Sequence, residues 1–227
     1  MAQFDFGQKV DPALFEKLIG EGCKVNASDY VQKGWEMFRE HIGEFIGFTL
    51  IYYLFQTVNI FAAPIVSSKI TFFGHSLLFL SLGSSLNAGY CIAAFRILTG
   101  KPFQFSDFFG GFNYFLPLFL ANLVGGIIYI VGIVLLILPG IYLAIGYMLT
   151  TFLVIDYRME FWQAMETSRK IVTKNWFAFF VFALLLGLIN LLGIIALGVG
   201  LLVSAPVTAC AAAIAYKEIV GLHSAEW

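Results

Sequence analysis

Four long stretches of this chain contain no Asp, Glu, Lys or Arg. They run for 24 residues after Glu44, 26 after Lys69, 48 after Asp107 and 42 after Lys174. A helix needs about 20 apolar residues to cross the hydrocarbon core of a bilayer, so the first two stretches accommodate one span each and the last two accommodate a pair each. The sequence therefore predicts an all-α integral membrane protein with six transmembrane helices.

The composition agrees with this class. Hydrophobic residues make up 60% of the chain and charged residues only 12%, whereas a typical soluble domain contains roughly 25% charged residues. The 13 basic and 14 acidic residues give a formal net charge of -1. Because this charge is mixed and close to zero, nucleic acid is not an expected partner.

Backbone-breaking residues indicate where the two paired segments turn. Pro139-Gly140 interrupts the first of them, and Gly198-Val199-Gly200 divides the second into two usable lengths. A turn at Pro206 would leave only about 15 Å of helix before Tyr216, so we interpret Pro206 as a kink inside the sixth helix. Helices four and six are nevertheless short, and hairpins that enter the membrane only half way remain an alternative.

The charges are distributed unevenly about the predicted spans. Of the 13 Lys and Arg residues, Lys69 alone falls on one side, and the others fall together with all 14 acidic residues. The positive-inside rule places the charged side and both termini in the cytoplasm, as in a multi-pass protein of the cell inner membrane. No disulfide is expected between Cys23, Cys91 and Cys210, which all lie toward that side.

An approximate internal repeat organises the chain into three pseudo-repeated helical hairpins. Each hairpin is preceded by an amphipathic segment on the cytoplasmic side, at residues 28–38, 105–112 and 161–170. We expect these segments to form an interfacial collar, with Trp35, Trp162 and Trp176 at headgroup depth.

Three domains follow from this organisation. Residues 1–27 form a cytoplasmic N-terminal segment, in which Asp11-Pro12 begins a short helix that could lie on the membrane or bind a partner. Residues 28–220 form the six-helix transmembrane domain, and residues 221–227 form a cytoplasmic tail.

Helices two and six carry small residues at four-residue spacing. These candidate helix-packing positions are Ser81, Ser85, Gly89, Ala93, Thr208 and Ala212. Small side chains let helix backbones approach closely in lipid, so we expect both helices to be central, and a homo-oligomer interface is the alternative. Helices one, three and five instead carry bulky residues such as Phe45, Phe48 and Phe182, which suit contact with lipid.

Five amide side chains fall inside the predicted spans: Gln56, Asn59, Asn87, Asn122 and Asn190. A polar group in hydrocarbon must find a partner or line a cavity. Hydrogen bonds between helices, worth about 1 kcal/mol each, are the simpler interpretation, and a ligand cavity is the alternative. None of the five is ionisable, which argues against transport coupled to protons or ions.

Charged residues end helices two, four and six at the cytoplasmic boundary: Arg96, Asp156, Arg158, Lys217 and Glu218. If these helices are central, the five charges could converge and pair across the bundle. In the link between the first two hairpins, Ser106-Asp107 is expected to cap the short helix that follows.

Residues typical of catalysis or metal binding are sparse. His41 and His75 fall at opposite membrane faces, about 30 Å apart, so they cannot share one metal or one haem. The sequence contains no HExxH or CxxC motif and no phosphate-binding glycine loop. We therefore expect neither a cofactor nor enzymatic activity.

Several short patterns resemble one bacterial family of polytopic membrane proteins. They are Tyr30-x4-Trp35-x2-Phe38, the link from Leu98 to Phe112, and Leu138-Pro139-Gly140-Ile141-Tyr142 followed by Trp162-x-Ala164-x3-Ser168-x-Lys170. The family is related to the membrane domain fused to some glycerophosphodiester phosphodiesterases and includes many stand-alone members of unknown function. The resemblance implies a six-helix membrane domain. It does not imply phosphodiesterase activity, which belongs to a separate soluble domain.

Two functions are compatible with these features. The first is a non-catalytic assembly or accessory module, which would form a homo-oligomer or join other membrane subunits and contact membrane lipids. The second is a carrier or flippase for a lipid or small hydrophobic molecule, with a cavity lined by the asparagines.

Overall fold

The computed structural model describes residues 12–62, 69–135, 137–196 and 198–223, and within these ranges it is helical and contains no strand. The prediction of an all-α fold is confirmed. In chain order the elements are α1 (Pro12–Glu21), α2 (Ala27–Glu40), α3 (Ile42–Ala62), α4 (Lys69–Leu98), the 3-10 helix η2 (Phe105–Tyr114), α5 (Phe115–Leu135), α6 (Ile137–Gly146), α7 (Thr150–Tyr157), α8 (Phe161–Lys174), α9 (Trp176–Ile195) and α10 (Leu201–Ile219).

Six segments are long and apolar enough to cross a membrane, which agrees with the predicted number. They are Ile42–Ala62, His75–Leu98, Phe105–Val134, Leu138–Tyr157, Trp176–Ile195 and Leu201–Ile219. The third includes η2 and α5, and the fourth includes α6 and α7. The chain is therefore a multi-pass membrane protein by length and composition.

Burial alternates along these six segments. Only 17% of the first, third and fifth is buried within the protein, against 56%, 44% and 61% of the second, fourth and sixth. Helices two and six are therefore the more central ones, as their small residues predict. The expectation of lipid contact is wrong for Phe45, Phe48 and Phe182, which are fully buried because other parts of the chain cover them.

The turn between α9 and α10 lies where the glycines predict it. Gly198 has a φ of +77°, and Pro206 lies inside α10. The turn predicted at Pro139-Gly140 is misplaced, since α6 already begins at Ile137 and contains both residues. Pro139 occupies the first turn of that helix, where its missing N–H costs no hydrogen bond. Gly140 instead serves close packing, because a Cβ built on Gly132 would come within 2.9 Å of its Cα.

The fourth span is a broken helix. α6 ends at Gly146 and α7 begins at Thr150, so the regular hydrogen-bond ladder is interrupted between them. The Ser168 hydroxyl of α8, which is fully buried, bridges the break. It donates a hydrogen bond to the Gly146 carbonyl at 2.7 Å and accepts one from the Leu149 N–H at 3.1 Å. One side chain therefore satisfies backbone groups on both sides of the interruption.

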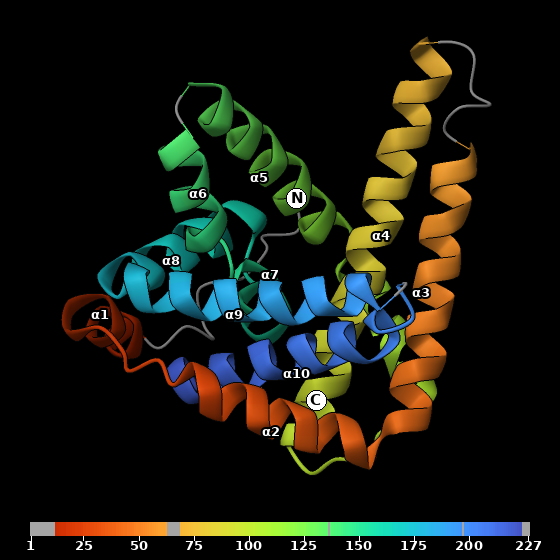
Figure 1. Ribbon diagram of the computed structural model, residues 1–227. Coiled ribbons are helices and arrows are strands. Elements are labelled where there is room, and N and C mark those ends of the chain that lie inside the picture. The colour runs from red at the N-terminus through yellow and green to blue at the C-terminus, as the bar shows by residue number, and fades with distance from the viewer. Residues whose placement is uncertain (1–11, 63–68, 136, 197, 224–227) are drawn as a thin grey trace, which may run out of the picture.

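The three hairpins do not all run in the same direction. In Figure 1 the tips of α3–α4 and α5–α6 point the same way, whereas α9 and α10 run across α3 and α4. α2 lies along α10 and runs antiparallel to it, with Gly34 against Ala211 and Lys33 against Glu218. A Cβ on Gly34 would come within 2.7 Å of the Ala211 nitrogen, so a larger residue would force the two helices apart.

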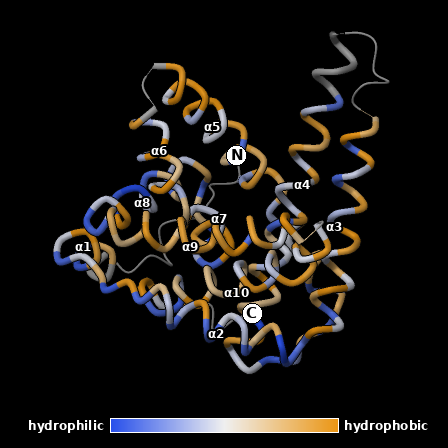
Figure 2. The backbone as a smooth tube through the Cα atoms, in the orientation of Figure 1, coloured by the Kyte–Doolittle hydropathy of each residue, from blue (hydrophilic) through white to orange (hydrophobic). Residues whose placement is uncertain are grey.

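Helices occupy all three of the segments that precede the hairpins. α2 buries Tyr30, Met37 and Phe38, whereas Glu36 and Arg39 are exposed. Its hydrophilic residues appear as blue stretches of the tube in Figure 2. η2 lies on α4, and a Cβ on Gly89 would overlap the Phe108 carbonyl oxygen. The cytoplasmic position of these helices stays a prediction.

The N-terminal helix begins at Pro12, the first residue of α1, as predicted. It packs on its own chain, where the Phe15 ring meets the Tyr157 ring at 5.2 Å. Asp11 lies outside the described residues, so its predicted capping role is not described.

Candidate functional site: an intramembrane polar cavity

Four of the five amides predicted inside the membrane gather around one hollow. Its volume is about 530 Å³, and its wall includes Gln56, Asn59, Asn87 and Asn122. The remaining described lining side chains include Tyr52, Ser76, Ser84 and Thr151, and none of the described lining residues is Asp, Glu, Lys or Arg. The hollow is therefore polar and uncharged, and its wall comes from spans of the first two hairpins and from Thr151 of the fourth span.

The central helix α4 directs Asn87 into this hollow. Asn87 is exposed although both its neighbours, Leu86 and Ala88, are buried. About nine residues, or roughly 14 Å of helix, separate it from Arg96 at the predicted boundary. An exposed amide at this depth is costly against lipid tails but stable in a hydrated cavity.

A second hollow continues from the first toward the third hairpin. It has a volume of about 580 Å³, shares Tyr52, Asn87 and Thr151 with the first, and is also lined by Asn190. The Asn190 amide donates a hydrogen bond to the Thr208 hydroxyl at 3.1 Å, which joins α9 to α10. Its carbonyl oxygen is buried and has no hydrogen-bond partner among the described residues, so this atom is available to water or a ligand.

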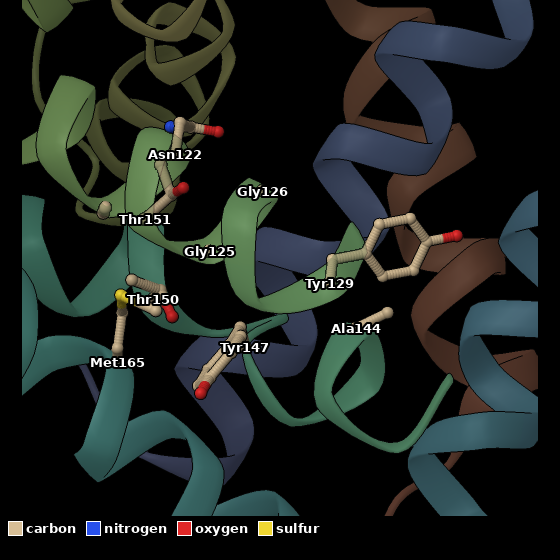
Figure 3. Close-up of a pocket in the computed structure, with 10 residues that line it drawn as sticks. Asn122, Gly125, Gly126, Tyr129, Ala144, Tyr147, Thr150, Thr151 and Met165 are labelled. Carbon is tan, nitrogen blue, oxygen red and sulfur yellow. The ribbon is translucent and has the colours of Figure 1, made fainter. Parts of the chain in front are cut away.

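A third hollow of about 370 Å³ adjoins the first at Asn122 and Thr151. Figure 3 shows these two side chains near one another, with Thr150, Tyr147 and Met165 below them in the view. Asn122 uses its NH2 group to donate to the Leu118 carbonyl of its own helix at 2.9 Å. Thr151 alone of the described residues lines all three hollows, and together we call these hollows the central cavity.

The break in the fourth span positions these threonines. Thr150 is the first residue of α7, is only 6% exposed, and its hydroxyl has no hydrogen-bond partner among the residues that the structure describes. Interrupted membrane helices are tolerated where they are buried in protein or line a cavity, and this one does both. Thr150, Thr151 and Ser168 were not predicted as site residues. The nearest local sign of the interruption is Gly146, the last residue of α6, and no glycine or proline follows at residues 147–149.

The small residues of helix two contact the link helix η2. Ser85 is fully buried, and a Cβ on Gly111 of η2 would overlap the Ser85 carbonyl oxygen. Ser81 is buried, its hydroxyl donates to the Leu78 carbonyl, and Ala93 is fully buried. In helix six, Thr208 and Ala212 line the second hollow. The stripe on helix two therefore supports close packing within one chain.

An aromatic cluster fixes η2 on the first hairpin. The Phe108 ring stacks on Phe48 with ring centroids 4.3 Å apart and meets the Phe45 ring edge-on at 5.3 Å. Beneath it the Tyr90 hydroxyl donates to the Thr49 hydroxyl at 2.9 Å, which links α4 to α3. This covering explains why Phe45 and Phe48 do not face lipid.

The five boundary charges contact different neighbours. Arg96 pairs with Asp107 at 3.3 Å, and the Lys217 ammonium donates to the Leu98 carbonyl at 3.3 Å. Glu218 pairs with Lys33 of α2. The predicted cap in the link is realised in modified form, since the Asp107 carboxylate accepts from the Gln104 N–H at 2.8 Å.

The other two boundary residues differ sharply in environment. Asp156 is 4% exposed, and its carboxylate accepts from the Tyr216 hydroxyl at 2.9 Å and from the His223 N–H at 3.2 Å. Arg158, two residues further on, is exposed. Asp156 therefore holds the C-terminal end of α10 and the start of the tail against α7.

Outside the spans, ion pairs and burial shift the pKa values of several groups. Arg169 binds Glu166 through two nitrogens at 2.7 and 2.8 Å and lowers the pKa of that carboxyl. Hydrogen bonds to Asp29 and Glu218 raise the pKa of Lys33. Burial raises the pKa of the Cys23 thiol, so it is a poor nucleophile.

Within the described ranges, no group of three or more His, Cys, Asp or Glu side chains could hold a metal ion. No protein-family model matches the chain, and neither a characterised protein nor a solved structure is detectably similar to it. Function must therefore be inferred from the chemistry of the site itself.

Proposed function

We propose that this protein is a carrier or flippase that binds an amphipathic molecule, such as a lipid, with its polar part in the central cavity. The observation that carries the proposal is the gathering of Asn87, Asn122 and Asn190, from three different hairpins, on neighbouring hollows that share lining residues. Asn190 also joins α9 to α10, yet its carbonyl oxygen has no hydrogen-bond partner among the described residues, so it retains an acceptor for a ligand.

The chemistry of the wall favours an uncharged, hydroxyl-rich polar group. The described lining residues of the first hollow offer amides, hydroxyls and a phenol, which donate and accept hydrogen bonds without carrying charge. A charged headgroup would lose its hydration there and find no counter-ion, at a cost of several kcal/mol. The apolar part of the ligand would remain among the lipid-facing helices.

The broken helix supports movement of the ligand. In secondary transporters, substrate sites lie near the midplane and are formed by discontinuous helices. Here the break between α6 and α7 lies directly beside Thr151, which lines each part of the cavity. A change in the angle between α6 and α7 would therefore alter all three hollows at once.

A pair of matched substitutions tests this proposal. The protein is reconstituted into vesicles, and the transbilayer movement of a fluorescent lipid with an uncharged glycosyl headgroup is measured. Thr151→Val keeps the shape but removes the hydroxyl from the cavity, whereas Thr57→Val removes a hydroxyl that is exposed on α3. We expect the first variant, and the double variant Asn122→Leu with Asn190→Leu, to lose most of the flux, and the second to retain it. Equal flux in all of these variants, in folded protein, would disprove the carrier function.

The assembly-module function has weaker support. It was expected from the small-residue stripe, and Ser85 and Gly89 of that stripe are in contact with η2 of the same chain. The proposed carrier needs no catalytic residue, so we propose no enzymatic activity. The relation to the membrane domain of glycerophosphodiester phosphodiesterases stays a prediction, as do the inner-membrane location and the cytoplasmic termini.

A further inference from the structure

A separate hollow of about 700 Å³ lies at the predicted cytoplasmic boundary. It is formed by the end of η2 and the start of α5 on one side and by the junction of α7 and α8 on the other. Its apolar wall includes Leu116, Leu120 and Val154, and its polar residues are Asn113, Tyr114, Arg158 and Glu160. It shares no lining residue with the central cavity.

The backbone at Arg158 is unusual. With a φ of 52°, Arg158 is the one non-glycine residue with positive φ in the described part of the chain. It ends α7 in the left-handed conformation, a position that glycine fills without strain. The buried side chains of Tyr157 and Met159 on either side fix this conformation, so the Arg158 side chain projects from an anchored segment. A charged residue retained in a strained conformation beside a hollow suggests a binding role.

Two opposite charges lie on the rim of this hollow. Arg158 carries the positive charge, Glu160 carries the negative charge, and both side chains are exposed. The Tyr114 hydroxyl interacts with the Arg158 side chain and adds a neutral polar group next to it. This rim is therefore complementary to a headgroup that carries both charges, with the apolar wall below it toward the membrane.

We propose that this hollow binds a phospholipid with a phosphoethanolamine headgroup from the adjacent leaflet. Arg158 would bind the phosphate, Glu160 would accept hydrogen bonds from the primary ammonium, and an acyl chain would lie against Leu116 and Leu120. An anionic headgroup without an ammonium would leave Glu160 facing a negative charge. A trimethylammonium headgroup has no N–H to donate to it. The proposal does not depend on transport through the central cavity.

Lipid binding to the purified full-length protein can test this assignment. Delipidated protein in detergent is titrated with dioleoyl-phosphatidylethanolamine, -phosphatidylglycerol or -phosphatidylcholine, and bound lipid is counted by native mass spectrometry. We expect phosphatidylethanolamine to bind about tenfold more tightly than either of the others, since one charged hydrogen bond distinguishes them. Arg158→Gln should weaken binding about tenfold, and Glu160→Gln should remove the preference for the primary ammonium. Arg39→Gln and Glu40→Gln, on the exposed face of α2, are the matched controls and should change nothing.

One further variant separates a binding role from a structural one. Arg158→Gly relieves the left-handed conformation, so the variant should be at least as stable as the natural protein while losing the bound lipid. Retention of the natural affinity in Arg158→Gly, or equal affinity for all three lipids, would overturn the proposal. Neither outcome bears on flux through the central cavity, which is measured separately with Thr151→Val.

Discussion

The helices of the first and third hairpins are all long and apolar enough to cross a membrane, but the two hairpins pack differently. α3 and α4 form a long hairpin that extends beyond the rest of the protein, whereas α9 and α10 run across it (Figure 1). α2 packs along α10, with Gly34 against Ala211 and Lys33 paired with Glu218. The mean hydropathy of a segment indicates whether a helix can lie in lipid. It does not indicate how the helix is oriented relative to the other helices. In the third hairpin an amphipathic partner sets that direction.

The largest expected difference between the hairpins is in membrane depth. Spin labels on α9 at Val181, Leu188 and Ile195, which are all exposed, should report similar depths if that helix lies along the membrane. Labels at Leu50 and Phe61 of α3 should differ by about 16 Å along the helix. The depths are measured by paramagnetic relaxation with a lipid-soluble and a water-soluble agent. A steady change of about 21 Å from 181 to 195 would show that α9 spans fully.

The next effect concerns the close contacts that hold each hairpin to its neighbour. Gly89→Ala would drive a methyl group into the Phe108 carbonyl, and Gly34→Ala would drive one into the Ala211 backbone. Each should lower the free energy of unfolding by about 1–3 kcal/mol, and Gly89→Ala should cost more because its overlap is closer. Unfolding of the purified protein in mixed micelles measures both. Equal stability to the natural protein would mean that η2 or α2 is displaced without cost.

A smaller effect of opposite sign is expected in α9. A Cβ on Gly187 would meet no atom within 4 Å, so Gly187→Ala should raise the free energy of unfolding by up to about 1 kcal/mol through helix propensity. The same unfolding assay applies. If this variant were destabilised, α9 would pack more tightly at position 187 than the structure indicates.

The smallest effect is the pH dependence from Glu166. Because its pKa is lower in the folded protein, its contribution to stability is present above about pH 4.3, its ordinary value, and is lost as the pH falls through the folded value. This partly exposed pair should contribute less than about 1 kcal/mol. Glu166→Gln should flatten the stability profile in that range, and Glu36→Gln on α2 is the control.

Local sequence patterns predicted much of the fold. Small residues marked α4 and α10 as the more buried helices, and Pro206 was identified as lying inside a helix. The break in the fourth span had only Gly146 as a local signal, and it is stabilised by Ser168, about 20 residues away. The burial of Phe48 likewise depends on a ring from η2, 60 residues further along the chain.

The candidate site was only half predictable. Polarity within apolar stretches identified Asn87 and the other amides, because such residues stand out in any membrane sequence. Their convergence depends on how three hairpins pack, which no residue pattern encodes directly. Thr151 was missed because threonine is common in membrane helices, where it satisfies its hydroxyl on its own backbone.

The hydroxyl of Ser168 connects the wall of the central cavity to α8, which lies outside the six apolar segments. It joins α8 to both ends of the interruption in the fourth span. A force applied to α8, whether by a docked protein or by a change in the surrounding bilayer, would pass through two hydrogen bonds to the wall at Thr150. A displacement of α8 would therefore change the shape of the central cavity, and a change in the cavity wall would displace α8.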